Sequence, residues 1–303
     1  MDAVVFPGQG SQKPGMGAPW VDTPSWAAVT LVSDVVGRDV GALLIDADAA
    51  TLQATRNAQI AAFALGLVIL DAARRAGLTW GAAAGHSLGE YTALVAAGSL
   101  PPHDAGRLVG ERAEAMQAAT EAAPGTMAAV LGLDADDVQK SCDAADGLAW
   151  IANDNAPGQI VIAGTPDGLE AASAAAKDAG VKRVTALNVG GAFHTPLMAS
   201  AADALVGELA DVVFHTPTAP VVSNLDATPH ADNDWRDRSA RHVTVTVRWR
   251  EGVLALRAMG VTRVVELGPG AVLTGMVKRI APDLGRASIG TPEEVGASAA
   301  GGG

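Results

Sequence analysis

The residues best suited to chemistry form a serine turn between two glycines, Gly85-His86-Ser87-Leu88-Gly89. Three alanines precede this turn and an apolar segment follows it, so the pattern predicts a strand, a sharp turn and a helix. The glycines let the backbone turn tightly and project the Ser87 hydroxyl into a cleft. Free amides at the helix N-terminus would face developing negative charge. We predict that Ser87 is a nucleophile and that the Leu88 amide is an oxyanion donor. The alternative is a plain glycine-bounded turn.

A serine nucleophile needs a base. The chain has six histidines: His86, His103, His194, His215, His230 and His242. His194 is the preferred candidate because small residues precede it and a helix start at Pro196 follows it, which suits a side chain delivered to a site. His86 lies inside the turn and would point away from the cleft. The alternative for His194 is a surface histidine, or a core histidine whose hydrogen bonds are satisfied.

The composition argues against several classes of function. The 303 residues carry 33 acidic and 21 basic side chains, a formal net charge of −12, which argues against a nucleic-acid partner. A single cysteine, Cys142, excludes a disulfide framework and a cysteine-rich zinc site. The sequence has no long apolar run free of charges or breakers, and its start does not resemble a signal peptide. We expect a cytoplasmic protein that works without a membrane, a metal or a cofactor.

The segments that must position Ser87 and His194 alternate between strand and helix. The predicted strands are 3–6, 82–85, 220–223 and 261–267, and the predicted helices are 51–76, 88–97, 101–119, 196–209 and 249–258. Such alternation is typical of an α/β fold with a mostly parallel sheet.

The middle of the chain has a different order of elements. Residues 126–188 follow the order β-α-β-β-α-β, which is typical of a ferredoxin-like unit. Its two middle strands are predicted at 148–152 and 159–163, joined by a polar loop at 153–158. We predict a small inserted domain at 125–190 and a large domain made of 1–124 and 191–296. The last residues, 297–303, are only Ala, Ser and Gly, and we predict a disordered tail there.

Five motifs occur in a fixed order between about residue 3 and about residue 290. They are Phe6-Pro7-Gly8-Gln9-Gly10-Ser11-Gln12, Gly85-His86-Ser87-Leu88-Gly89-Glu90-Tyr91, Arg112 with Met116, Gly191-Ala192-Phe193-His194 and Glu266-Leu267-Gly268-Pro269-Gly270. Together they resemble the malonyl-CoA:acyl-carrier-protein transacylases, acyltransferases of fatty-acid and polyketide synthesis. The resemblance implies an α/β-hydrolase-like large domain with a ferredoxin-like small domain, in agreement with the element order above.

The resemblance also assigns roles to the predicted residues. Ser87 would attack the malonyl thioester of coenzyme A, with His194 as base and then acid. The amides of Gln9 and Leu88 would form the oxyanion hole. The acyl group would pass to the phosphopantetheine thiol of an acyl carrier protein, with no cofactor or metal.

Three further residues would shape the acyl pocket by resemblance. Arg112 matches the arginine that binds the malonyl carboxylate, since a guanidinium can form two parallel hydrogen bonds with it. The alternative is an ordinary helix-surface arginine. Gln59 resembles a glutamine of the same pocket, although Ile60 replaces the proline that usually follows. Phe193 resembles the residue that accompanies malonyl rather than methyl-branched units, because its rigid ring leaves no room beside the α-carbon.

In the family, a main-chain carbonyl orients the catalytic histidine. The corresponding segment here is 245–249, where Arg248 replaces the usual glutamine. A second local feature is a cluster of seven arginines between 236 and 263. It could bind coenzyme A phosphates or an acidic carrier, or could simply be a solvated face.

Three other functions fit the same motifs. A thioester hydrolase would share Ser87 and His194 and pass the acyl group to water. A transacylase subunit of malonate decarboxylase would share the transfer chemistry, and a non-catalytic docking protein would share only the fold.

Overall fold

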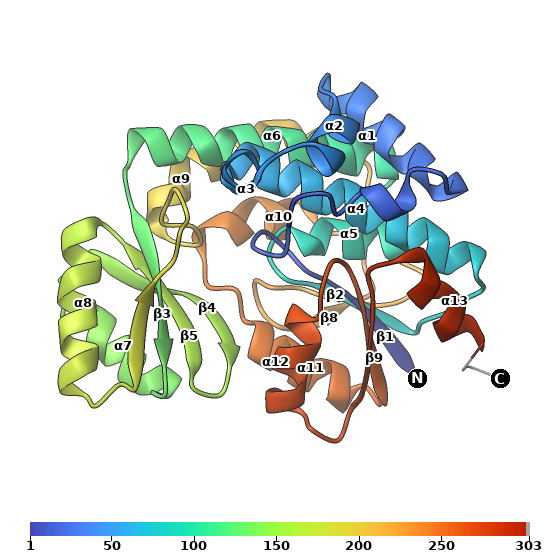
Figure 1. Ribbon diagram of the computed structural model, residues 1–303. Helices are drawn as coiled ribbons and strands as arrows, with labels where there is room; N and C mark the ends of the chain where they lie inside the picture. The colour runs from blue at the N-terminus through green and yellow to red at the C-terminus, as the bar shows by residue number, and fades with distance from the viewer. Residues whose placement is uncertain (301–303) are drawn as a thin grey trace.

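The computed structural model describes residues 1–300 and contains two β-sheets (Figure 1). The larger sheet has the strand order β10-β9-β1-β2-β7-β8. Its strands are β1 (Asp2–Phe6), β2 (Ala82–Gly85), β7 (Val221–Val222), β8 (Pro229–His230), β9 (Arg263–Leu267) and β10 (Gly285–Ile289). All neighbours are parallel except β8, which is antiparallel to β7. The prediction of a mostly parallel α/β sheet is confirmed.

Helices cover both faces of this sheet. Val4 and Phe6 of β1 face the core that includes α4, while Ala3 and Val5 face the core that includes α11 and α12. Both faces are buried, so a central parallel strand is a continuous apolar run. The helices of this part are α1 (Ala27–Val36), α2 (Val40–Ile45), α3 (Ala49–Gln53), α4 (Thr55–Arg75), α5 (Gly89–Ala96), α6 (Pro102–Ala122), α9 (Ala199–Leu209), α10 (Arg236–Arg241), α11 (Trp249–Ala258), α12 (Val272–Ile280) and α13 (Pro292–Ala300), with 3₁₀ helices η1 (Ala18–Trp20), η2 (Pro24–Trp26), η3 (Pro196–Met198) and η4 (His242–Thr244).

The long helix predicted at 51–76 is two helices, α3 and α4, because Ala54 leaves the helical conformation with ψ 128°. By length and composition α4 could cross a membrane, but 83% of its apolar stretch is buried inside the protein. It is therefore the core helix of this part of the molecule, and Gln59 lies on it fully buried.

The smaller sheet is antiparallel and has the order β4-β5-β3-β6 (Figure 1, left). Its elements are β3 (Thr126–Leu131), α7 (Ala135–Asp143), β4 (Ala149–Ala156), β5 (Gln159–Gly164), α8 (Pro166–Asp178) and β6 (Arg183–Ala186). The predicted ferredoxin-like order is confirmed. Helices α7 and α8 pack on one face, while Met127 and Val161 on the other face join the core of the large sheet. The domain limits at 125 and 190 stay a prediction.

Two sequence predictions are wrong at their ends. Strand β4 runs on through Asn153-Asp154-Asn155 to Ala156, which composition had assigned to a loop. The Asp154 amide donates to the Val247 carbonyl, and the Val247 amide donates to the Ala152 carbonyl, so this polar stretch has strand partners. The disordered tail predicted from 297 is also wrong over 297–300. Alanine has the highest helix propensity, so α13 continues through Ala300. Residues 301–303 lie outside the described residues.

Candidate active site

Ser87 lies in the predicted turn between β2 and α5, with a positive φ of 52°. A Cβ atom on Gly85 would overlap the backbone of Gly89, and one on Gly89 would overlap the carbonyl of Phe6. The turn therefore packs directly on the end of β1, at a distance that only glycine allows. This close packing is the physical reason for the glycine spacing around Ser87.

His194 meets Ser87 in the structure. The Nε2 atom of His194 lies 2.7 Å from the Ser87 Oγ atom, and its Nδ1 atom lies 3.0 Å from the carbonyl oxygen of His242. A carbonyl can only accept, so Nδ1 carries the hydrogen and Nε2 is left to accept from the hydroxyl. The side chain reaches this place because Gly191 passes against Thr120 of α6, where a Cβ atom would clash. The arrangement is a nucleophile with a general base.

Burial sets the protonation state of this base. The His194 pKa falls to about 3, first because burial disfavours the imidazolium and then because the positive charge of Arg112 repels it. The carbonyls of His242 and Val245 oppose the shift. The imidazole is therefore neutral at pH 7, the form that can accept a proton.

The 3.0 Å partner of the His194 Nδ1 atom is the carbonyl of His242, which starts η4 and lies just before the predicted segment 245–249. The carbonyl of Val245, the first residue of that segment, also acts on the ring. The later residues have other partners: Val247 pairs with the edge of β4, and the Arg248 side chain binds Glu251 and the Asp226 carbonyl. His194 therefore faces the turn from His242 to Val245.

Arg112 is not a surface residue, since only 1% of it is exposed. Its Nη2 atom donates to Ser87 Oγ at 3.2 Å, and its Nη1 atom donates to Gln59 Oε1. The Gln59 amide in turn donates to the Met116 sulfur at 3.4 Å. Within residues 1–300, the Arg112 Nε atom has no hydrogen-bond partner. A buried guanidinium without a carboxylate partner is a binding position for an anion.

These side chains surround a cleft of about 110 Å³. Five of the predicted residues line it, namely Gln9, Ser87, Arg112, Phe193 and His194, together with His86, Met116, Met127, Asn153, Leu187 and Val189. Leu88 and Gln59 do not line it and lie buried behind it. An apolar wall with one cation suits a short acyl chain that ends in a carboxylate.

The amides of Gln9 and Leu88 are available to a ligand. Within residues 1–300, neither nitrogen donates a hydrogen bond to another protein group. The two loops lie against each other, because a Cβ atom on Gly8 would come within 3.5 Å of the Leu88 nitrogen. This placement fits two donors aimed at one oxyanion.

Sequence reasoning missed two polar residues behind Ser87. The Asn224 Oδ1 atom accepts from the Ser87 amide at 3.0 Å, and its Nδ2 atom donates to the Gly85 carbonyl at 2.7 Å. The Glu90 Oε2 atom accepts from the amide of Asn224 at 2.6 Å and from its side chain. Burial raises the Glu90 pKa to about 7. The available signals were an acid in the first turn of an apolar helix, and an asparagine just past a parallel strand.

The seven clustered arginines all have partners in the protein. Their acceptors are the Leu209 and Val212 carbonyls for Arg236, Asp232 for Arg238, Asp237 for Arg241, Glu251 for Arg248, Asp154 for Arg250, Asp283 for Arg257 and Asp2 for Arg263. Each of the seven arginines is therefore already paired within the protein. Within residues 1–300 no group of three or more His, Cys, Asp or Glu side chains could hold a metal ion.

Comparison with known proteins places this geometry in a family. A family model for the acyl transferase domain matches residues 3–289. The malonyl CoA-acyl carrier protein transacylase of Escherichia coli (strain K12) is 40% identical, covering 98% of both chains. The enzyme of the same name from Bacillus subtilis (strain 168) is 38% identical, covering 97% of this chain and 94% of its own.

Solved structures give the same result. An acyl-carrier-protein S-malonyltransferase from Burkholderia pseudomallei is 41% identical with a TM-score of 0.94, covering 99% of both chains. A malonyl-transacylase solved in complex with its type II polyketide acyl-carrier protein is 37% identical with a TM-score of 0.95, again over 99% of both chains. This chain therefore belongs to the malonyl CoA-acyl carrier protein transacylase family of acyl transferases.

Proposed function

We propose that this chain moves a malonyl group from coenzyme A to the phosphopantetheine thiol of an acyl carrier protein, through an ester on Ser87. The supporting observation is the Ser87 Oγ atom between the His194 base at 2.7 Å and the buried Arg112 guanidinium at 3.2 Å. The transacylase complex with a carrier protein supports the choice of partner.

In the first half of the reaction, the Ser87 hydroxyl gives its proton to His194 Nε2 as its oxygen bonds to the thioester carbonyl carbon. The amides of Gln9 and Leu88 hold the oxyanion, and one such donor is worth about 10²–10³ in rate. The carbon–sulfur bond then breaks, and the imidazolium returns its proton to the sulfur of coenzyme A.

The second half reverses these steps with a new thiol. The carrier thiol gives its proton to His194 and attacks the ester carbonyl, and the ester oxygen leaves as the Ser87 hydroxyl. Ser87, His194 and Arg112 supply the nucleophile, the base and the cation, so we propose a reaction without a cofactor, in the cytoplasm.

Arg112 and Phe193 select the acyl group in this proposal. The substrate carboxylate pairs with the Arg112 guanidinium, which has no carboxylate partner in the described protein. This pairing holds the thioester carbonyl against Ser87. Phe193 closes the cleft beside the α-carbon, so an extra methyl is disfavoured. A pocket distinguishes one carbon by only about 1–3 kcal/mol, and a preference rather than an exclusion follows.

The test is intact-mass measurement after incubation with a panel of acyl-CoA thioesters. We expect a malonyl adduct on the wild type and none on Ser87→Ala. Arg112→Ala should load malonyl at least about 100-fold more slowly, since a charge-assisted hydrogen-bonded pair is lost, and should load neutral acyl groups comparatively better. The matched control is Arg107→Ala, because Arg107 is on the same helix but binds Glu208.

Two outcomes would contradict the proposal. Equal malonyl loading by wild type and Arg112→Ala would remove Arg112 from substrate binding. Release of radiolabelled malonate to water, with no label on an added holo carrier protein, would show a thioester hydrolase instead.

A further inference from the structure

Glu90 is a buried acid that the mechanism above does not use, and it closes a ring of contacts around the two reacting side chains. From Ser87 the ring runs through its amide to Asn224, and from Asn224 to the Glu90 Oε2 atom. The other oxygen of Glu90 lies 3.7 Å from the His242 Nδ1 atom. The His242 carbonyl accepts from His194, and His194 returns to the Ser87 hydroxyl. Glu90 therefore contacts both Asn224, which binds the Ser87 amide, and His242, whose carbonyl binds His194.

The His242 ring needs a partner of this kind. It is fully buried, and within residues 1–300 neither ring nitrogen has a hydrogen-bond partner. A buried N–H without an acceptor is costly, and 3.7 Å is just beyond hydrogen-bond distance. A small rotation of the ring would bring Nδ1–H onto the Glu90 carboxylate. That bond would also hold the backbone of His242, whose carbonyl orients His194.

We propose that Glu90 is a positioning residue for acyl transfer, which holds Ser87 through Asn224 and His194 through His242. This inference rests on the proposed roles of Ser87 and His194. Glu90 touches no reacting atom, and its effect passes through the amide of Ser87 and the carbonyl that fixes the His194 tautomer.

The charge of Glu90 matters to this role, because every group it holds is a donor. The titratable or charged groups around it are Arg112 on α6, His242 on η4, Asp226 after β7 and Tyr91 on its own helix. Burial raises the Glu90 pKa to about 7, while Asn224 and Arg112 oppose the shift. Above that pH the carboxylate accepts from Asn224, and the rotated His242 ring would donate to its other oxygen. Below it, one oxygen carries a proton, and the ring of contacts loses an acceptor.

The experiment compares Glu90→Gln with wild type in two assays. In malonyl transfer to a holo carrier protein, we expect kcat to fall about 10- to 100-fold with little change in KM. We also expect the acid limb of the wild-type pH profile, near pH 7, to disappear. In the second assay, a neutral sulfonyl fluoride modifies Ser87 directly, and its rate should fall by a similar factor. The matched control is Glu266→Gln, since Glu266 is an equally buried acid in β9.

An unchanged sulfonylation rate and an unchanged acid limb in Glu90→Gln would overturn the proposal. If the wild type forms no malonyl adduct, the proposed function fails, yet the sulfonyl fluoride comparison still tests Glu90. Should Glu90→Gln melt below the assay temperature, His242→Ala decides, because it keeps the carbonyl and removes only the ring. A slower sulfonylation in that variant, with an unchanged melting temperature, supports the ring of contacts, and a wild-type rate refutes it.

Discussion

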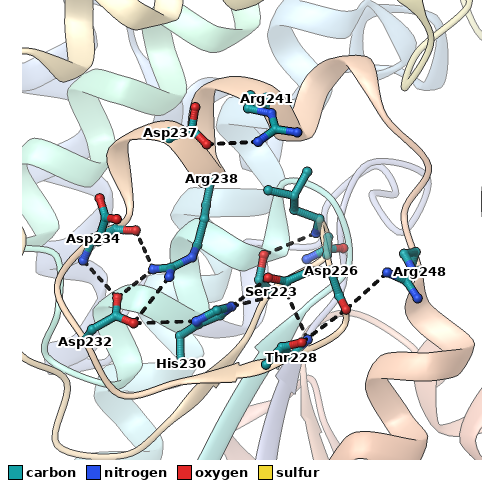
Figure 2. A network of polar contacts seen from close by, with 12 residues as sticks. Ser223, Asp226, Thr228, His230, Asp232, Asp234, Asp237, Arg238, Arg241 and Arg248 are labelled. Atoms are coloured by element: carbon teal, nitrogen blue, oxygen red, sulfur yellow. Dashed lines mark hydrogen bonds and ion pairs between the residues drawn. The ribbon is translucent and has the colours of Figure 1, made fainter.

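The segment between β7 and α11 takes part in two polar networks, an inner one that also includes Glu90 of α5 and an outer one at the surface. The inner network consists of Asn224, Glu90 and His242, and the side chains of Glu90 and His242 are 2% and 0% exposed. The outer network, drawn in Figure 2, centres on Asp232, which binds Arg238 and lies 3.6 Å from His230. The Asp232 side chain is 50% exposed. One stretch of chain thus faces the reaction with its inner side and water with its outer side.

Exposure changes what a polar contact is worth. In the outer network each ion pair replaces good hydration and is screened by salt, so an exposed pair contributes about 0–1 kcal/mol. In the inner network the groups have already lost their water, so removing one partner leaves an unsatisfied group that costs about 1–3 kcal/mol. The outer pairs hold a loop in place, whereas the inner contacts fix the two reacting side chains.

The two networks are physically joined. The Arg248 amide donates to the Asn224 carbonyl at 3.3 Å, and the Arg248 side chain donates to the Asp226 carbonyl at 3.2 Å. Changes in the outer network could therefore reach Ser87, and substitutions on each side measure how far they do.

Asn224→Ala should have the largest effect. It removes the acceptor of the Ser87 amide, the side-chain donor to the Gly85 carbonyl and one donor to Glu90. We expect a loss of at least about 100-fold in kcat and of roughly 2–4 kcal/mol in the free energy of unfolding, since several buried groups lose partners. Steady-state malonyl transfer and urea unfolding measure the two. The exposed Asn233→Ala is the control, and a loss below threefold in Asn224→Ala would show that the inner contacts are redundant.

Glu90→Gln should separate stability from function. In the folded protein the Glu90 pKa is about 7, above the ordinary value of 4.5, so the native state binds more protons between these values. The free energy of unfolding therefore falls as pH rises through this window because of Glu90. Gln does not titrate, so the free energy of unfolding of Glu90→Gln lacks this pH dependence. The difference between the variant and the wild type should therefore favour the variant by up to about 3 kcal/mol more at pH 8 than at pH 5. Urea unfolding at both pH values measures this, and an equal difference at both would contradict it.

The site was predictable where its signal is local. The turn at Ser87 is encoded by glycines two residues on either side, and the positions of His194 and Arg112 followed from motif resemblance. Asn224 lies 137 residues from the Ser87 amide that it accepts from. No spacing in the sequence marks such a contact, because it exists only after β2 and β7 pair in the sheet. The His242 carbonyl was missed for the same reason, since it lies 48 residues from the His194 ring that it orients.

The fold shows the same division. Continuous apolar runs predicted β1 and β2, and the element order predicted the ferredoxin-like unit. Strand β10, with an exposed start at Gly285-Arg286, carries neither a buried run nor alternation, so only its pairing with β9 makes it a strand. The polar end of β4 was assigned to a loop because Asn and Asp favour turns, and its tertiary partners override that preference.

Asp232→Asn should have the smallest effect, and it tests the outer network. Its pairing with Arg238 lowers the Asp232 pKa, so the contribution to stability is present above the ordinary value of 3.8 and is lost as pH falls below it. Because half of the Asp232 side chain is exposed to water, we expect the free energy of unfolding to fall by at most about 1 kcal/mol at pH 7. This difference should become smaller in roughly 0.5 M salt, because salt screens exposed ion pairs. Malonyl transfer should stay within twofold of wild type. A loss of activity at unchanged stability would show that a change at Asp232 reaches Asn224 through Arg248, and the two networks would then act as one.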